Sequence, residues 1–199
     1  MMPRSRRSGF TLMELLVAVA LFGIIAAGLS AVYGMVFGRL YSQFSDLAVA
    51  NGETLVRRAF DSAVGPATYI QDPSAGTLAG HLTVWANLDA DGSTPLVGSV
   101  AQFSYLCSDA AGQHIYLYQG QGLPASWSPP TSCGASLSNA TLMPLAGGPG
   151  FQNTLAFYRP YELNQLIQMS CGLTLTDKRG LEHSADVQTQ AVANANGQH

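Results

Sequence analysis

Charged residues are scarce in this chain. Asp, Glu, Lys and Arg make up 11% of its 199 residues, against about a quarter in ordinary soluble domains. The formal net charge is −3, so the composition gives no general electrostatic reason to bind nucleic acid. Three cysteines are too few for a disulfide scaffold, and their spacing is not that of a zinc site.

Motifs for catalysis are also lacking. The sequence contains no HExxH, no GxSxG and no Walker phosphate loop, each of which places catalytic groups at a fixed spacing. Its 8 Tyr, 8 Phe and 2 Trp exclude a disordered chain. The aromatic content therefore favours one folded domain, and the lack of catalytic motifs favours a protein that is not an enzyme.

The charges that are present are unevenly distributed. Arg4, Arg6 and Arg7 lie in the first nine residues, and 24 uncharged residues run from Leu15 to Gly38. A helix of that length spans about 36 Å, which is enough to cross the core of a bilayer. Basic residues before the apolar run and acidic residues after it predict a cytoplasmic N-terminus and an exported C-terminal part.

The sequence GFTLMELLVA, from Gly9 to Ala18, resembles the amino-terminal signature of type IV prepilins and type II secretion pseudopilins. The resemblance covers residues 4–38. It implies that residues 1–9 are a leader peptide, that a prepilin peptidase cuts between Gly9 and Phe10, and that the new amino group of Phe10 is methylated. It further implies a single-pass subunit of the bacterial inner membrane, in contact with lipid, which later joins a periplasmic or extracellular filament.

Glu14 is the one charge in the apolar segment. A carboxylate inside a membrane is costly unless it is paired. The resemblance implies that Glu14 is an assembly residue, which pairs with the Phe10 amine of an adjacent subunit. A carboxylate that reaches the membrane edge is the alternative interpretation.

The helical pattern continues beyond the apolar run. Apolar residues recur at steps of three and four up to residue 59, and Gly65-Pro66 ends the pattern. We therefore expect one helix over residues 10–64, with a transmembrane or filament-core half at 10–38 and an amphipathic half at 39–64. Residues 65–199 form the exported β-rich domain.

Alternating β-branched and aromatic residues predict strands in this domain. The stretch Gln119–Gly150, rich in Gly, Pro and Ser, is predicted to be a long loop. The fold class is α+β, a pilin-like lollipop in which the long helix packs on an antiparallel β-sheet. The predicted strands are His81–Asn87, Val100–Cys107, His114–Gln119, Thr154–Arg159, Gln165–Thr176 and His183–Ala193.

One predicted turn carries part of a calcium-loop pattern. Asn87, Asp89 and Asp91 place oxygen-bearing side chains at alternate positions before Gly92, as in the first half of a calcium loop. The bidentate Glu of that loop is missing, because its position is Gly98. The pattern therefore favours an Asp-Gly turn over bound calcium, and no other cofactor is expected.

The cysteines of an exported domain are expected to form one disulfide. Cys107 ends a predicted strand and Cys133 lies in the long loop, so a bond between them would hold the loop to the sheet. Cys171 alternates with apolar residues in a predicted strand and is expected to be free and buried. A Cys107–Cys171 bond is the alternative.

Two functions remain at this stage. The size and the strand content are more typical of a minor pilin or a J-type minor pseudopilin than of a compact major pilin. The resemblance implies prepilin peptidase, other pilin or pseudopilin subunits and an inner-membrane assembly platform as partners. The alternative is a membrane-anchored binding module such as a DNA-uptake receptor. Against it, removing the three leader arginines from nine basic residues leaves six against twelve acidic residues.

Overall fold

The computed structural model describes residues 11–161 and 165–194, and the chain divides into two compact units, residues 1–43 and 44–199. A single α-helix, α1, spans Leu12–Val64. The strands that follow are β1 (Tyr69–Asp72), β2 (Leu78–Ala79), β3 (His81–Ala86), β4 (Gln102–Ser108), β5 (His114–Gln121), β6 (Ala140–Gly147), β7 (Phe151–Tyr158), β8 (Leu166–Thr176) and β9 (Glu182–Val192), with a short 3-10 helix at Pro124–Ser126.

The first unit, in the part that the structure describes, is helical from Leu12 onward. Its large apolar side chains are exposed almost without exception, and Phe22 and Ile24 are each at least 70% exposed. Within the described residues, α1 is the one helix that is long and apolar enough to cross a membrane. A helix that is apolar on all sides needs an apolar surrounding.

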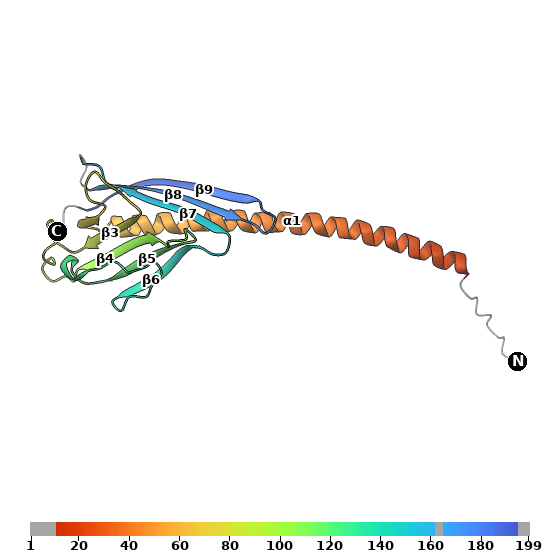
Figure 1. The fold of residues 1–199 in the computed structure, drawn as a ribbon, viewed down its shortest axis with the longest axis horizontal. Coiled ribbons are helices and arrows are strands. Elements are labelled where there is room, and N and C mark those ends of the chain that lie inside the picture. Colours follow the sequence, from red (N-terminus) through yellow and green to blue (C-terminus); the bar gives the residue numbers. More distant parts are fainter. Residues whose placement is uncertain (1–10, 162–164, 195–199) are drawn as a thin grey trace. The chain divides into compact units, whose positions relative to one another are not determined.

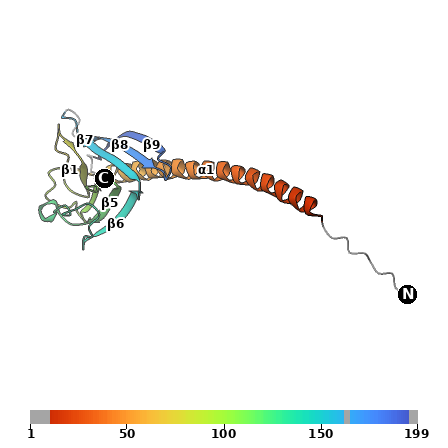
Figure 2. The same ribbon diagram turned by 45° about the vertical axis from the view of Figure 1, so that its right-hand side comes forward.

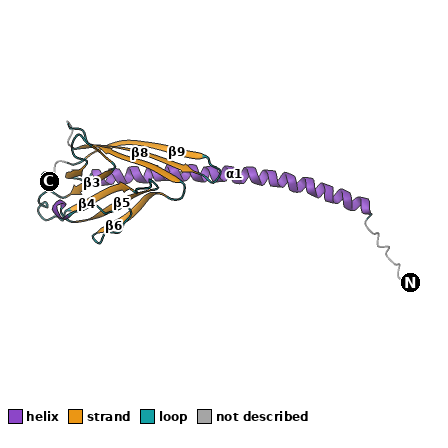
Figure 3. Cartoon of the chain, in the orientation of Figure 1, coloured by secondary structure: helices purple, strands orange, loops and turns teal. Residues whose placement is uncertain are grey.

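The second unit contains all nine strands, in two antiparallel sheets. The five-stranded sheet has the order β1-β3-β4-β5-β6, and the four-stranded sheet has the order β2-β7-β8-β9. Figure 1 shows the C-terminal part of α1 between β3–β6 on one side and β7–β9 on the other, and the turned view of Figure 2 shows the same arrangement. Figure 3 shows how short the loops are between most of these strands.

The main core lies where α1 meets both sheets. Val56, Phe60 and Val64 of α1 are fully buried, and the Phe60 ring stacks on Phe157 of β7 with centroids 6.2 Å apart. Gly52 permits a close approach, since an added Cβ would lie 3.1 Å from the Cβ of Ala146 in β6. The amphipathic face of the helix is thus the part that both sheets cover.

A second apolar cluster covers the other face of the five-stranded sheet. Trp85, Phe103 and Tyr118 are buried there, and Trp127 of the β5–β6 connection packs on Phe103 with ring centroids 4.1 Å apart. The disulfide Cys107–Cys133 joins the same connection to β4. This connection therefore acts as a lid over the aromatic side chains.

The predicted fold class is confirmed, since a long helix packs on antiparallel strands. The six predicted strands are present with shifted ends, and α1 stops at Val64, one residue before Gly65. The β-structure forms two sheets, because the inward faces of both pack on α1.

The prediction of one long loop over Gln119–Gly150 was wrong. β6 occupies Ala140–Gly147 and pairs with β5 over its whole length. Pro144 obscured the alternation, but it lies in an edge strand, where a missing N–H donor is tolerated. The short strands β1 and β2 were also missed, because strands of four and two residues carry too little pattern.

Candidate processing and assembly site

The start of α1 is capped by two of its own side chains. Thr11 N–H donates to Glu14 Oε2 at 3.0 Å, and Glu14 N–H donates to Thr11 Oγ1 at 3.3 Å. The Thr11 hydroxyl also donates to Glu14 Oε2 at 3.1 Å. This is a capping box, in which a Thr and a Glu three residues later satisfy the free N–H groups of the first turn. The T-x-x-E spacing of Thr11 and Glu14 in the sequence is the signal that predicts this cap.

Apolar side chains surround this cap. Met13 is 73% exposed and Val17 is 52% exposed, so the carboxylate of Glu14 stands in an apolar surface of the helix. A carboxylate and an apolar surface together suit a partner that offers both a cation and apolar side chains.

The predicted cleavage and methylation residues, Gly9 and Phe10, lie outside the described residues. Cleavage between them and methylation of Phe10 stay predictions. The described helix begins two residues after Phe10.

The predicted calcium residues form a hydrogen-bonded turn. The carboxylate of Asp89 accepts from Ser93 N–H at 2.8 Å and from the Thr94 hydroxyl, and that hydroxyl in particular holds the pKa of Asp89 below its usual range. Asp91 accepts from Ser93 N–H at 2.9 Å, and Asn87 donates to the carbonyl of Val100 at 3.2 Å.

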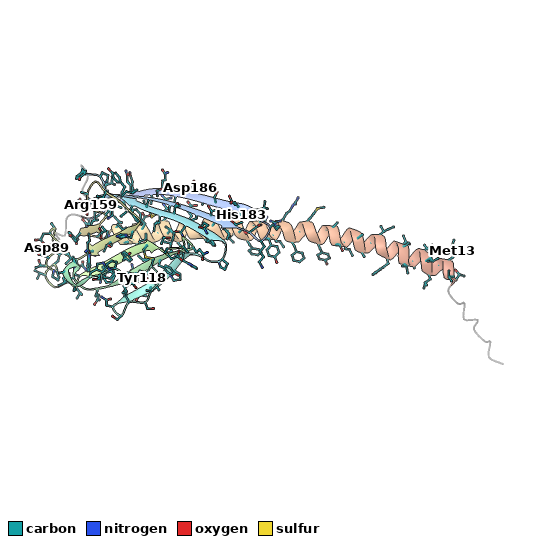
Figure 4. All side chains as sticks on the ribbon, in the orientation of Figure 1. Met13, Asp89, Tyr118, Arg159, His183 and Asp186 are labelled. Carbon is teal, nitrogen blue, oxygen red and sulfur yellow. A yellow bond between two sulfur atoms is a disulfide. The ribbon has the colours of Figure 1, made fainter. Side chains whose placement is uncertain are left out.

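Figure 4 labels Asp89 in this turn. Among residues 11–161 and 165–194, no group of three or more His, Cys, Asp or Glu side chains is placed to hold a metal ion. The hydrogen bonds of this turn explain why oxygen-bearing side chains alternate at these positions.

The predicted disulfide between Cys107 and Cys133 is confirmed, with Cα atoms 6.1 Å apart. Tyr118 reinforces it, because its hydroxyl accepts from Gly134 N–H at 2.7 Å and donates to the Ala135 carbonyl at 2.9 Å. Cys171 is free and buried, as predicted, and burial raises the pKa of its thiol to about 12. That thiol is therefore unreactive while the unit is folded.

One contact between α1 and β9 was not predictable from the sequence. His183 of β9 and Asp46 of α1 lie 2.7 Å apart, Nδ1 to Oδ1, although 137 residues separate them in the sequence. Figure 4 labels His183 beside α1. No local sequence pattern predicts such a pair, because the two residues come together only in the folded unit.

Comparison with known proteins locates one family signal in the chain. Residues 4–30 match the family model described as the prokaryotic N-terminal methylation motif. Comparison with curated proteins and with solved structures gives no match. The matched residues include the basic leader, Gly9, Phe10, the Thr11–Glu14 cap and the first two thirds of the apolar run. The motif implies processing by a prepilin peptidase and anchoring in the inner membrane before assembly. The chain therefore carries the N-terminal methylation motif of type IV pilin-like proteins, and the second part of that motif is the start of the long helix α1.

Proposed function

We propose that this protein is a minor pilin or a J-type minor pseudopilin, a non-catalytic subunit that enters or primes a type IV pilus or a type II secretion pseudopilus. The observation that carries the proposal is the methylation motif at residues 4–30, which overlaps α1 from Leu12 onward. The same helix supplies the core of a β-rich unit through Val56 and Phe60. One continuous helix thus serves the membrane and the folded domain.

The proposal assigns a role to each segment. Prepilin peptidase removes residues 1–9 as a leader and methylates the amino group of Phe10. Residues 10–38 anchor the subunit in the inner membrane and then enter the filament core, and residues 39–64 are the amphipathic half of the same helix. Residues 65–199 are the exported domain. An inner-membrane assembly platform and other pilin or pseudopilin subunits are the partners.

Glu14 is the proposed assembly residue. Its carboxylate stands among exposed apolar side chains, where an ion is costly without a counter-charge. The amine of Phe10 in a neighbouring subunit provides that charge once the leader is removed. Because each subunit offers one amine and one carboxylate about a turn apart, the pair fixes the axial offset between neighbours.

The elaborate β-unit supports the assignment as a minor subunit. Two sheets cover α1, and the disulfide holds a long β5–β6 connection over a second cluster of aromatic side chains. A subunit that occupies one place in a filament makes only a few specific contacts. Its surface can therefore carry a second sheet and a long connection.

Incorporation of Glu14→Gln into filaments tests the proposal. Gln is also accepted in a capping box, so this variant keeps a cap for α1 and removes only the charge. We expect wild-type levels in the inner membrane and at least about a tenfold loss from sheared filaments, corresponding to roughly 1.4 kcal/mol per subunit. Glu53→Gln, on the same helix but beyond the apolar run, is the matched control and enters normally. Equal incorporation of both variants would remove Glu14 from the assembly contact.

Sheared filaments also identify the partners. The proposal expects subunits with the same type of leader to co-purify with the wild-type protein. Recovery of a monomer alone, from cells that make intact filaments, would contradict it.

A further inference from the structure

The inward face of the five-stranded sheet changes from apolar to polar along its strands. Near the middle of the unit it is apolar, with Leu106 and Leu117 in the main core. Two residues further along the same strands, the same face carries Ser104 in β4 and Gln119 in β5, followed by Gln102 and Gln121. Since alternate residues of a strand share a face, these polar side chains continue the core face beyond the point where the core ends.

A concavity of about 930 Å³ lies over this polar end. Its volume is in the range of ligand-binding pockets. The last turn of α1 forms one wall with Ser62 and Ala63, and the residues before β6 form another with Ser138 and Asn139. All of these residues belong to the second unit.

Several polar side chains of the concavity have no protein partner, although Ser62 donates to the Ala59 carbonyl and Asn87 to the Val100 carbonyl. Within the described residues, the side chains of Ser104, Gln119 and Gln102 make no hydrogen bond. Ser104 and Gln119 are partly exposed, so water reaches their polar atoms, and a ligand with suitable donors and acceptors can replace that water. An occupant that supplies both donors and acceptors would satisfy them.

The chemistry of the wall limits the occupant. Of the described residues that line the concavity, none is charged. Phosphates and carboxylates are held by Arg or Lys, and cations by carboxylates, so an ionic ligand finds no counter-charge here. Amide and hydroxyl side chains each donate and accept hydrogen bonds, which matches a ligand rich in uncharged hydroxyl groups.

A peptide strand fits less well. The residues of the concavity lie on the face of the sheet, and its central strands β4 and β5 are paired on both sides. A main-chain ladder, the usual source of affinity for an extended peptide, therefore cannot form there. From the neutral wall, its unpaired amides and its size we infer that this concavity binds a neutral saccharide chain. The inference goes beyond the proposed filament function and does not depend on it.

Titration of the full-length protein in detergent micelles tests the inference. The probes are maltohexaose, which carries only hydroxyl groups, chitohexaose, which adds acetamido groups, and the acidic hexamer of galacturonate. Side-chain amide signals of Gln102, Gln119 and Gln121 are followed by NMR. We expect one of the neutral hexamers to shift these signals with a Kd of about 1–10 mM, and the acidic hexamer to leave them unchanged.

Paired variants separate binding from folding. The double variant Gln102→Ala/Gln119→Ala is expected to raise the Kd about tenfold, since it removes two hydrogen-bonding side chains. Gln168→Ala/Gln188→Ala, on exposed positions of β8 and β9, is the control and leaves the Kd unchanged. The Cys107–Cys133 bond and the melting temperature verify that both variants are folded.

Four results would overturn the inference. They are no shift with either neutral hexamer up to about 20 mM, equal shifts in the double variant, equal binding of the acidic hexamer, and a photo-crosslinking residue at Gln119 that captures a protein in the native host. The last result would assign the concavity to a contact between proteins.

Discussion

His183 of β9 and Asp46 of α1 form a hydrogen bond of 2.7 Å, in which the imidazole Nδ1 donates to the carboxylate. The side chain of His183 is 9% exposed and that of Asp46 is 66% exposed. The other ring nitrogen, Nε2, is buried, lies 3.8 Å from Asp177 Oδ2 and has no hydrogen-bond partner within the described residues. This contact joins the β8–β9 hairpin to α1 near the start of the second unit.

The coupling between these two residues is measurable. We expect Asp46→Asn and His183→Ala each to destabilise the protein, and the pair to show a coupling energy of about 1 kcal/mol in a double-mutant cycle, since one partner is largely exposed. Denaturant unfolding of the full chain in micelles provides the four free energies. His81→Ala, whose Nε2 lies 4.0 Å from Asp72, is the control for loss of an exposed imidazole. Purely additive effects of the two substitutions would show that the bond adds nothing.

The β8–β9 turn makes stability depend on pH. Hydrogen bonds from Leu181 N–H, then from Arg179, hold the pKa of Asp177 below its ordinary value of 3.8. A carboxylate with a lowered folded-state pKa stabilises the protein at neutral pH, and this contribution disappears as the pH falls below about 4. Asp177→Asn is therefore expected to melt at a lower temperature than the wild type at pH 7 and to approach it near pH 2.

The control for Asp177 is Asp61→Asn, an exposed carboxylate of α1. It should keep the acid dependence of the wild type. A constant gap between Asp177→Asn and the wild type at all pH values would mean that the variant acts through shape and not through ionisation.

The disulfide stabilises the lid over the aromatic cluster. Cys107 and Cys133 are 26 residues apart, so their bond removes chain entropy worth roughly 3 kcal/mol from the unfolded state. Cys107→Ala/Cys133→Ala should lose about that amount in denaturant unfolding. Reductant should lower the stability of the wild type and leave the double variant unchanged. A wild type that is indifferent to reductant would show that the lid is held by packing and by Tyr118 alone.

At Gly52, residues of both sheets pack close to α1. A Cβ there would lie 3.1 Å from Ala146 Cβ and 3.4 Å from Leu173 Cδ1. Gly52→Leu is expected to destabilise the unit by about 1–3 kcal/mol through overpacking, despite the better helix propensity of Leu. Ala50→Leu, on an exposed position of the same helix, is the control and should change stability by less than about 0.5 kcal/mol. A neutral Gly52→Leu would mean that the sheets can separate at this point.

The parts of the fold that were predictable depend on local patterns. The 24-residue apolar run and Gly65-Pro66 predicted α1 within two residues at each end, because propensity and helix-stop signals act locally. The six predicted strands carry a regular alternation. β6 did not, since Pro144 and its small residues mask the period, and pairing with β5 stabilises it instead.

Some of the candidate sites were likewise predictable from local patterns, and others depend on the fold. The pairing of Cys107 with Cys133 followed from the position of one cysteine at a strand end and the other in a loop. The contact of His183 with Asp46 and the polar concavity around Gln119 were not predictable, because they join elements whose spacing only the folded sheets define. The resemblance implied the assembly role of Glu14, and the T-x-x-E spacing is the local signal for its capping bond with Thr11.

The mass of the mature protein tests the central claim most directly. The protein is purified from the membranes of its native host, with Gly9→Val as the variant that places a branched side chain at the scissile bond. Gly23→Val, where an added Cβ meets nothing within 4 Å, is the control. Intact-mass analysis should show wild type and control without residues 1–9 and with one added methyl group on Phe10, and the Gly9→Val variant uncut. A mature wild-type protein that keeps residues 1–9 would contradict the account.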